Sequence, residues 1–175
     1  MNPVNKNKFL ILLGLSLMLF VQHSSAETLQ DRKIALLLEY LAADLQIIEG
    51  VGLQRIKLGD PMSKVRTVFG QTRTARELVT DSLVLEASLD ANTRLRVTGR
   101  QRVRKMAFKG NQQSLYTTQS GARFGMPAYE VITTYGPAVV TDKGKGKTLT
   151  YPRKGIRFRI QHGVVDVIEV FPPSS

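Results

Sequence analysis

Residues 59–70 read GDPMSKVRTVFG and residues 125–136 read GMPAYEVITTYG, so one pattern recurs at an offset of 66 positions. The first Gly, the Pro, a Val, a Thr and the final Gly recur in register, and an aromatic residue precedes that final Gly both times. Internal repetition of this kind indicates a duplicated supersecondary unit. The pattern therefore predicts an architecture, and it does not by itself indicate a reaction.

Each copy of the pattern predicts a short helix. The first Gly permits a turn, and Pro is favourable at the first helical position because an N–H there has no partner within the helix. Val65 and Phe69 lie four residues apart and share one helical face, as do Val131 and Tyr135. A helix of about two turns is unstable in water alone. We therefore expect both faces to be buried against a sheet.

Runs of β-branched and aromatic residues follow each helix, with alternating polarity and turn residues between them. Strands that follow helices in this way favour an α+β fold. We predict two tandem units, each a turn, a short helix and an antiparallel meander of about three strands, with the helices packed on one face of the sheet. The predicted strands are 82–89, 93–98 and 103–108 in the first unit, and 148–151, 156–160 and 164–171 in the second.

The pattern Gly-x-Pro-x3-Val-x4-Gly followed by alternating strands resembles the repeat of the β-lactamase-inhibitor-protein fold. It is also similar to the small outer-membrane-assembly lipoproteins of the BamE (small protein A) type. The resemblance covers roughly residues 53–171 as two copies, and it implies a helix pair on an antiparallel sheet and a role in binding other proteins. Those lipoproteins carry a lipidated Cys, whereas this chain has no Cys.

The N-terminus has the pattern of a signal peptide. Lys6 and Lys8 precede an apolar run over residues 9–21, and small residues lead to Ala26. We expect cleavage after Ala26 and a periplasmic or secreted protein, with an uncleaved anchor as the alternative. The predicted division is 1–26 signal peptide, 27–52 amphipathic helix, 53–112 first unit and 113–175 second unit. No later segment is apolar over a length that could span a membrane.

The predicted N-terminal helix carries an apolar stripe at spacings of three and four residues. We favour packing of this stripe on the protein's own sheet over docking to a partner helix or to a membrane surface. The stripe comprises Ile34, Leu37, Leu38, Leu41, Leu45 and Ile48, and Gly50 and Gly52 are expected to end the helix.

Positive charge is concentrated in two stretches. The chain has 25 basic and 14 acidic residues; without Lys6 and Lys8 this leaves 23 and 14, a net charge of +9. No carboxylate occurs in residues 91–129 or 143–165. Because neighbours on a strand point to opposite faces, alternation places the arginines on the face away from the helices. The candidate binding residues are Arg94, Arg96, Arg100, Arg102, Arg104, Arg157 and Arg159.

These arginines support two interpretations. A basic surface that serves only solubility is the plainer one. We favour an anionic contact, because the arginines recur on corresponding strands and no acidic residue is interspersed in the sequence to relieve cross-strand repulsion. The expected partner is an acidic protein surface or an anionic lipid or lipopolysaccharide headgroup. Nucleic acid is the least favoured partner, since few aromatic residues are interleaved for base stacking.

Catalytic patterns are poor. His162 is the one histidine after Ala26, next to Gly163 in an expected turn, and no Gly-x-Ser-x-Gly elbow accompanies it. One His and no Cys do not suffice for the usual zinc site. We predict no enzyme activity, no catalytic residue, no cofactor and no metal.

The sequence thus predicts an exported cell-envelope binding protein, either an envelope-assembly factor or a protein inhibitor, that uses a basic sheet face. A small periplasmic hydrolase or lipid-headgroup enzyme is the alternative. A structural accessory subunit that uses the apolar N-terminal helix is a further one.

Overall fold

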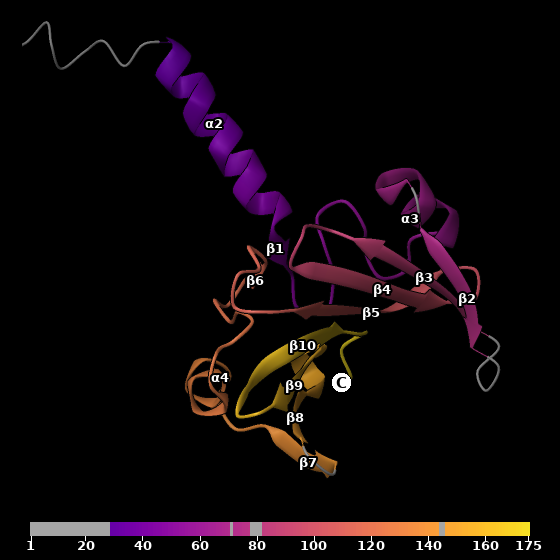
Figure 1. Cartoon of the computed structure of the whole chain (residues 1–175), viewed down its shortest axis with the longest axis vertical. Coiled ribbons are helices and arrows are strands. Elements are labelled where there is room, and N and C mark those ends of the chain that lie inside the picture. The colour runs from indigo at the N-terminus through magenta and orange to yellow at the C-terminus, as the bar shows by residue number, and fades with distance from the viewer. Residues whose placement is uncertain (1–28, 71, 78–81, 144–145) are drawn as a thin grey trace, which may run out of the picture. The chain divides into compact units, whose positions relative to one another are not determined.

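The computed structural model describes residues 29–175 apart from 71, 78–81 and 144–145 (Figure 1). The predicted signal peptide, residues 1–26, lies outside the described residues. The chain divides into two units, one up to Leu41 and one from Ala42 onwards. The elements are α2 (Leu29–Asp44), β1 (Gln46–Ile47), α3 (Met62–Phe69), β2 (Arg73–Glu77), β3 (Ser82–Ser88), β4 (Thr93–Gly99), β5 (Val103–Gly110), β6 (Thr117–Thr118), α4 (Ala128–Tyr135), β7 (Val139–Lys143), β8 (Gly146–Tyr151), a short 3-10 helix (Pro152–Lys154), β9 (Ile156–Gln161) and β10 (Val164–Val170).

The second unit is built on an eight-stranded antiparallel sheet in the order β2-β3-β4-β5-β10-β9-β8-β7. β5 and β10 pair at its centre, with Phe108 opposite Ile168. The predicted α+β class is confirmed, and each of the six predicted strands has a counterpart. The edge strands β2 and β7 were not predicted, because short strands at a sheet edge lack a regular buried pattern. β1 and β6 form a separate parallel pair.

One side of the sheet carries a continuous apolar row. Directly opposed residues share a face, and this row crosses six neighbouring strands, so it forms the floor of the core. All of its members are buried. They are Ala87, Leu95, Phe108, Ile168, Phe158 and Leu149.

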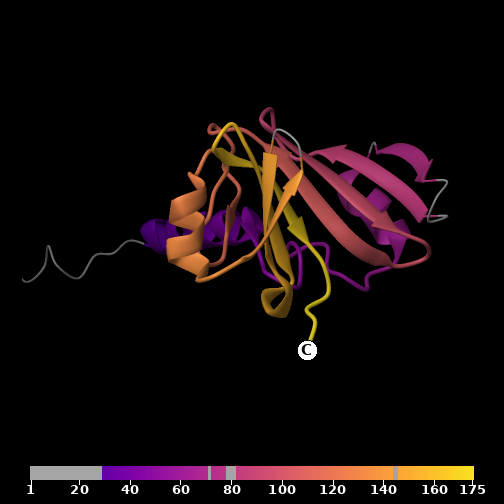
Figure 2. The same ribbon diagram turned by 90° about the horizontal axis from the view of Figure 1, so that it is seen from below.

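The two short helices occur where the repeated pattern predicts them. Val65 of α3 and Val131 and Tyr135 of α4 are buried in the same cluster as the large side chains of the apolar row, whereas Phe69 is only partly buried. Figure 2 shows α4 beside β7–β10. Each helix ends at a glycine with positive φ, but each proline is the N-cap residue and not the first helical residue as predicted.

The turn before each helix is held by three backbone hydrogen bonds to the last strand of the same half of the sheet and to the hairpin turn that precedes that strand. In both halves the first Gly donates to a strand carbonyl, and the same strand residue donates back to the residue after that Gly. The bonds are Gly59 N to Val103 O (2.8 Å), Val103 N to Asp60 O (2.8 Å) and Met62 N to Gln101 O (2.9 Å), and then Gly125 N to Val165 O (2.9 Å), Val165 N to Met126 O (2.9 Å) and Ala128 N to Gly163 O (3.2 Å).

The N-terminal helix differs from its prediction. It ends at Asp44, and the chain then enters β1, where Ile47 is fully buried. The stripe is partly buried only near this end, where Leu45 packs against the core. Ile34, Leu37, Leu38 and Leu41 are 49–62% exposed. The helix was expected to continue through Ile48, but the backbone is extended at β1. The extended backbone allows the side chain of Ile47 to reach the core. Among the described helices, none is long and apolar enough to cross a membrane.

Candidate functional site

The side of the sheet opposite the apolar row is polar, and we call it the polar sheet face. It comprises the side chains of β2–β5 and β8–β10 that alternate with the core residues. Arg94 and Arg96 lie on it from β4, and Arg157 and Arg159 from β9, since each neighbours a buried residue of the apolar row. Four of the seven predicted arginines therefore share this face, as the alternation predicted.

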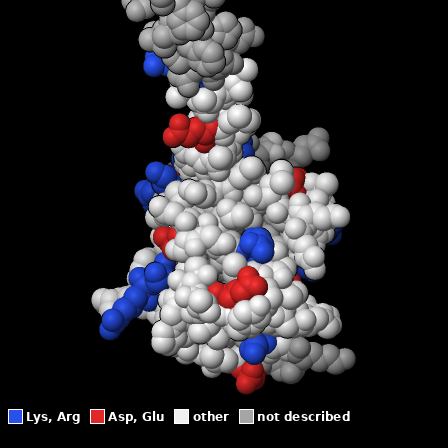
Figure 3. Space-filling view, turned by 90° about the vertical axis from the view of Figure 1, so that its left-hand side faces the viewer, with Lys and Arg blue, Asp and Glu red and all other residues white. Residues whose placement is uncertain are grey.

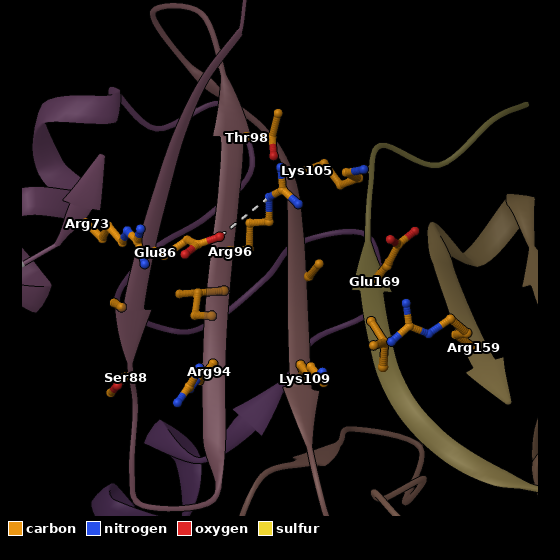
Figure 4. Close-up of a pocket in the computed structure, with 14 residues that line it drawn as sticks. Arg73, Glu86, Ser88, Arg94, Arg96, Thr98, Lys105, Lys109, Arg159 and Glu169 are labelled. Atoms are coloured by element: carbon orange, nitrogen blue, oxygen red, sulfur yellow. Dashed lines mark ion pairs between the residues drawn. The ribbon is translucent and has the colours of Figure 1, made fainter. Parts of the chain in front are cut away.

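A depression with a volume of about 600 Å³ lies on the polar sheet face. Six cationic side chains and two acidic ones line it, above small floor residues such as Ala107 and Val167. Figure 4 shows the lining side chains arranged in rows across the strands. On the side of the molecule seen in Figure 3, in contrast, acidic and basic side chains are dispersed among uncharged ones. The lining cations are Arg73, Arg94, Arg96, Lys105, Lys109 and Arg159.

Three of the predicted arginines have acidic partners on neighbouring strands. Arg159 Nε lies 3.0 Å from Asp166 Oδ1, and this hydrogen-bonded pair holds the pKa of Arg159 above its usual value. Arg157 Nη1 lies 3.1 Å from Glu169 Oε2, and its guanidinium also lies over the ring of Phe171. The expectation that no acid relieves the cross-strand repulsion is therefore wrong for these residues, because strand pairing places Asp166 and Glu169, which follow the acid-free stretch 143–165, beside the arginines of β9.

Arg96 has the weakest of these pairs. Its Nε lies 4.0 Å from Glu86 Oε1, and both side chains are about half exposed, so the interaction is screened by solvent. Figure 4 shows Arg73, Glu86 and Arg96 in one row across three strands. Glu86 lies between the two arginines, so one of the two positive charges in this row is compensated.

The next row has no acid. Ser88, Arg94 and Lys109 lie directly opposite one another on β3, β4 and β5 (Figure 4). Val167 of β10 follows Lys109 in the same row. Neither Arg94 nor Lys109 forms an ion pair with any residue that the structure describes. We call Ser88, Arg94 and Lys109 the donor row.

The other three predicted arginines lie elsewhere. Arg100, Arg102 and Arg104 are exposed around the β4–β5 hairpin and line a separate shallow pocket. Arg102 Nη1 donates to the carbonyl of Gly59, 2.9 Å away. A register shift after Thr98 turns this segment out of the strand alternation, so the sequence pattern could not place it on a face.

A buried polar cluster was not predicted from the sequence. Tyr135 Oη donates to Glu49 Oε1, and it lies 2.7 Å from Thr118 Oγ1. Ser120 N also donates to Glu49. Burial alone would raise the pKa of Glu49, but these hydrogen bonds outweigh it and lower that pKa. Burial and the bond to Glu49 raise the pKa of Tyr135. The cluster joins the segment after α2 to α4 and β6, so we assign it to stability.

His162 is the residue considered for catalysis on the basis of the sequence. His162 is exposed in the β9–β10 turn with φ of 53°, which agrees with its interpretation as a turn residue. Among the residues that the structure describes, no group of three or more His, Asp or Glu side chains is placed to hold a metal ion.

No family model and no curated protein matches this chain. Among solved structures, it is similar to the uncharacterized protein YfeY from Escherichia coli, with a TM-score of 0.53, 11% identity, and coverage of 72% of this chain and 97% of that protein. This similarity concerns the fold alone. A cysteine-rich secretory protein from Staphylococcus aureus has a TM-score of 0.40, 13% identity, and coverage of 65% and 44%, too low to carry an argument. The resemblance to β-lactamase inhibitor proteins and BamE-type proteins stays a prediction.

Proposed function

We propose that this chain is an exported binding protein of the cell envelope, an assembly factor or a protein inhibitor, that contacts an acidic surface of another protein with its polar sheet face. The observation that carries the proposal is the depression lined by six cationic and two acidic side chains. A concave cationic surface attracts acidic partners and raises their rate of association. The proposed export rests on the signal-peptide pattern of residues 1–26.

We also infer that the two halves of the sheet are copies of one unit. The inference is supported by the recurrence of the pattern at 59–70 and 125–136 and by the matching turn hydrogen bonds. The strand order supports it further, because α3 precedes β2–β5 and α4 precedes β7–β10. The last strands of the two sets, β5 and β10, pair with each other. Joining two copies in this way extends one polar face across the strands of both halves, which suits a protein partner better than a small molecule.

The proposal is of binding without catalysis. Arg157 and Arg159 are engaged by Glu169 and Asp166, so they contribute shape and positioning more than free charge. The contact with the partner then depends mainly on cations with no described carboxylate partner, such as Lys105, or with only a long, solvent-screened pair, such as Arg96. Such contacts are screened over about 8 Å at physiological ionic strength.

The test is capture of a partner from envelope extract by the mature protein, at low and at physiological salt. The double variant R96E/K105E reverses two charges that line the depression. We expect it to slow association, measured by surface plasmon resonance with the captured partner, while leaving the thermal unfolding midpoint nearly unchanged, because exposed charges contribute little to folding.

The matched control is K57E/R66E, which reverses two exposed charges that do not line the depression. It changes net charge equally, so it should retain most of the association rate. Equal association rates for the parent and both double variants at low salt would reduce the polar sheet face to a solubilising surface, and the structural-accessory alternative would then lead.

A further inference from the structure

The donor row is the place on the polar sheet face where positive charge is least compensated. Arg96, Arg157 and Arg159 each face a carboxylate within 4.0 Å. Arg94 and Lys109 are directly opposite each other on adjacent strands, and no described carboxylate pairs with either one. Like charges in directly opposed positions destabilise a sheet. An anion between them would remove that repulsion.

The chemistry of the row selects the kind of anion. A guanidinium and an ammonium supply only hydrogen-bond donors, and the adjacent Ser88 hydroxyl adds a donor that can rotate. Two positive charges without a counter-charge match an anion of charge near −2. A phosphomonoester carries about −1.5 to −2 at pH 7 and presents three acceptor oxygens.

The surroundings leave room for such a group. Ser88, Arg94 and Lys109 all line the depression, and the neighbouring positions on the central strands β5 and β10 are the small Ala107 and the apolar Val167. Arg94 and Lys109 are both exposed, so a ligand can reach them from solvent. The third cation in this row, Arg159, lies beyond Val167 and is already bound by Asp166.

We propose that Ser88, Arg94 and Lys109 form a binding site for a phosphate dianion, either free or as a phosphomonoester. The inference rests on the proposed function, since it names one anion that the polar sheet face recognises. The two proposals can be tested separately, because the phosphate site consists of three residues and the partner contact involves the whole polar sheet face. Charge-assisted hydrogen bonds are about twice as strong as neutral ones, so the two cationic donors would supply most of the affinity for phosphate.

The test is equilibrium unfolding of the mature protein in increasing inorganic phosphate, with sodium chloride and sodium acetate at matched ionic strength. A ligand that binds only the folded state raises the unfolding midpoint with the logarithm of its concentration. We expect this rise with phosphate in the parent. R94Q and K109Q should each weaken phosphate binding, measured by calorimetry, by about tenfold or more.

These variants have a second signature that a general loss of folding would not produce. In phosphate-free buffer R94Q and K109Q should each unfold at a higher midpoint than the parent, because the opposed like charges are gone. K105Q is the matched control: Lys105 lines the same depression but lies opposite Thr98, outside the donor row. It should retain the phosphate response.

Three results would overturn the site: equal rises in chloride and phosphate, equal rises in acetate and phosphate, or equal losses in K105Q and K109Q. Vesicles of phosphatidic acid, compared with phosphatidylcholine vesicles, identify the source. Binding to phosphatidic acid that K109Q abolishes supports a lipid phosphomonoester, and a response to inorganic phosphate alone supports a soluble one. If R96E/K105E impairs capture but phosphate has no effect, the site is refuted while the proposed function stands.

Discussion

Replacing Tyr135 with phenylalanine isolates one hydrogen bond of the buried polar cluster. The ring of Tyr135 packs against Tyr151 and Phe158 at centroid distances of 5.1 and 5.0 Å, and phenylalanine keeps that packing. The phenol has one proton, which it donates to Glu49, so the Thr118 hydroxyl is the donor in its contact with Tyr135. The substitution removes both interactions and leaves a half-buried carboxylate with one fewer donor.

The expected loss follows from the charge on the acceptor. Hydrogen bonds to charged groups contribute about 1.5–3 kcal/mol and neutral ones about 0.5–1.5 kcal/mol. Tyr151 provides the matched control, because its hydroxyl donates to the neutral carbonyl of Gly136 at 3.2 Å. At neutral pH, Y135F should therefore lower the free energy of unfolding by roughly twice as much as Y151F, on the same scale.

The difference should depend on pH. The folded-state pKa of Glu49 is lowered, so its contribution to stability is present above the unfolded pKa of about 4.3 and is lost as pH falls through the folded pKa. Below that pKa, Tyr135 faces a neutral carboxylic acid in the parent protein. The cost of Y135F should then fall towards that of Y151F.

Urea unfolding followed by circular dichroism, at neutral pH and at several acidic values, measures these differences. The reasoning fails if Y135F and Y151F lose the same stability at neutral pH. It also fails if the gap between them is unchanged at the lowest pH where the parent still folds. E49Q in the Y135F background should add little to the loss, since the two residues act through the same bond.

Three further predictions concern packing, backbone and export. Tyr135→Ala should cost about 3–5 kcal/mol in chemical unfolding, whereas Phe69→Ala should cost less because Phe69 is only partly buried; equal losses would contradict the assigned burial. Gly155→Ala should destabilise more than Gly59→Ala, since both glycines have positive φ but a Cβ at Gly155 would lie 2.3 Å from a backbone oxygen and one at Gly59 meets nothing within 4 Å; similar unfolding midpoints would refute this. Mass analysis of the exported protein should find cleavage after Ala26, and retention of the full N-terminus in a membrane pellet would contradict export with cleavage.

The local pattern of the sequence was sufficient for the element types and for part of the candidate site. Glycine and proline positions predicted both short helices, and alternation predicted the six inner strands and the face on which Arg94, Arg96, Arg157 and Arg159 lie. These features depend on backbone geometry and on a period of two residues, both of which are local. The prediction that the N-terminal helix continues to Ile48 was wrong, because the backbone is extended at Ile47, whose side chain is buried in the core.

Only the tertiary structure decided which charges meet. Glu86 pairs with Arg96 and Glu169 with Arg157 because strand register sets each carboxylate opposite one particular arginine of the neighbouring strand. The same register leaves Arg94 opposite Lys109 with no described carboxylate paired to either one. Tertiary packing also brings Glu49 to Tyr135 across 86 residues. Composition and spacing determined that the sheet has a basic face. The pairing of strands determined which of its cations are free to bind, since electrostatic interactions act over distances in space and not along the chain.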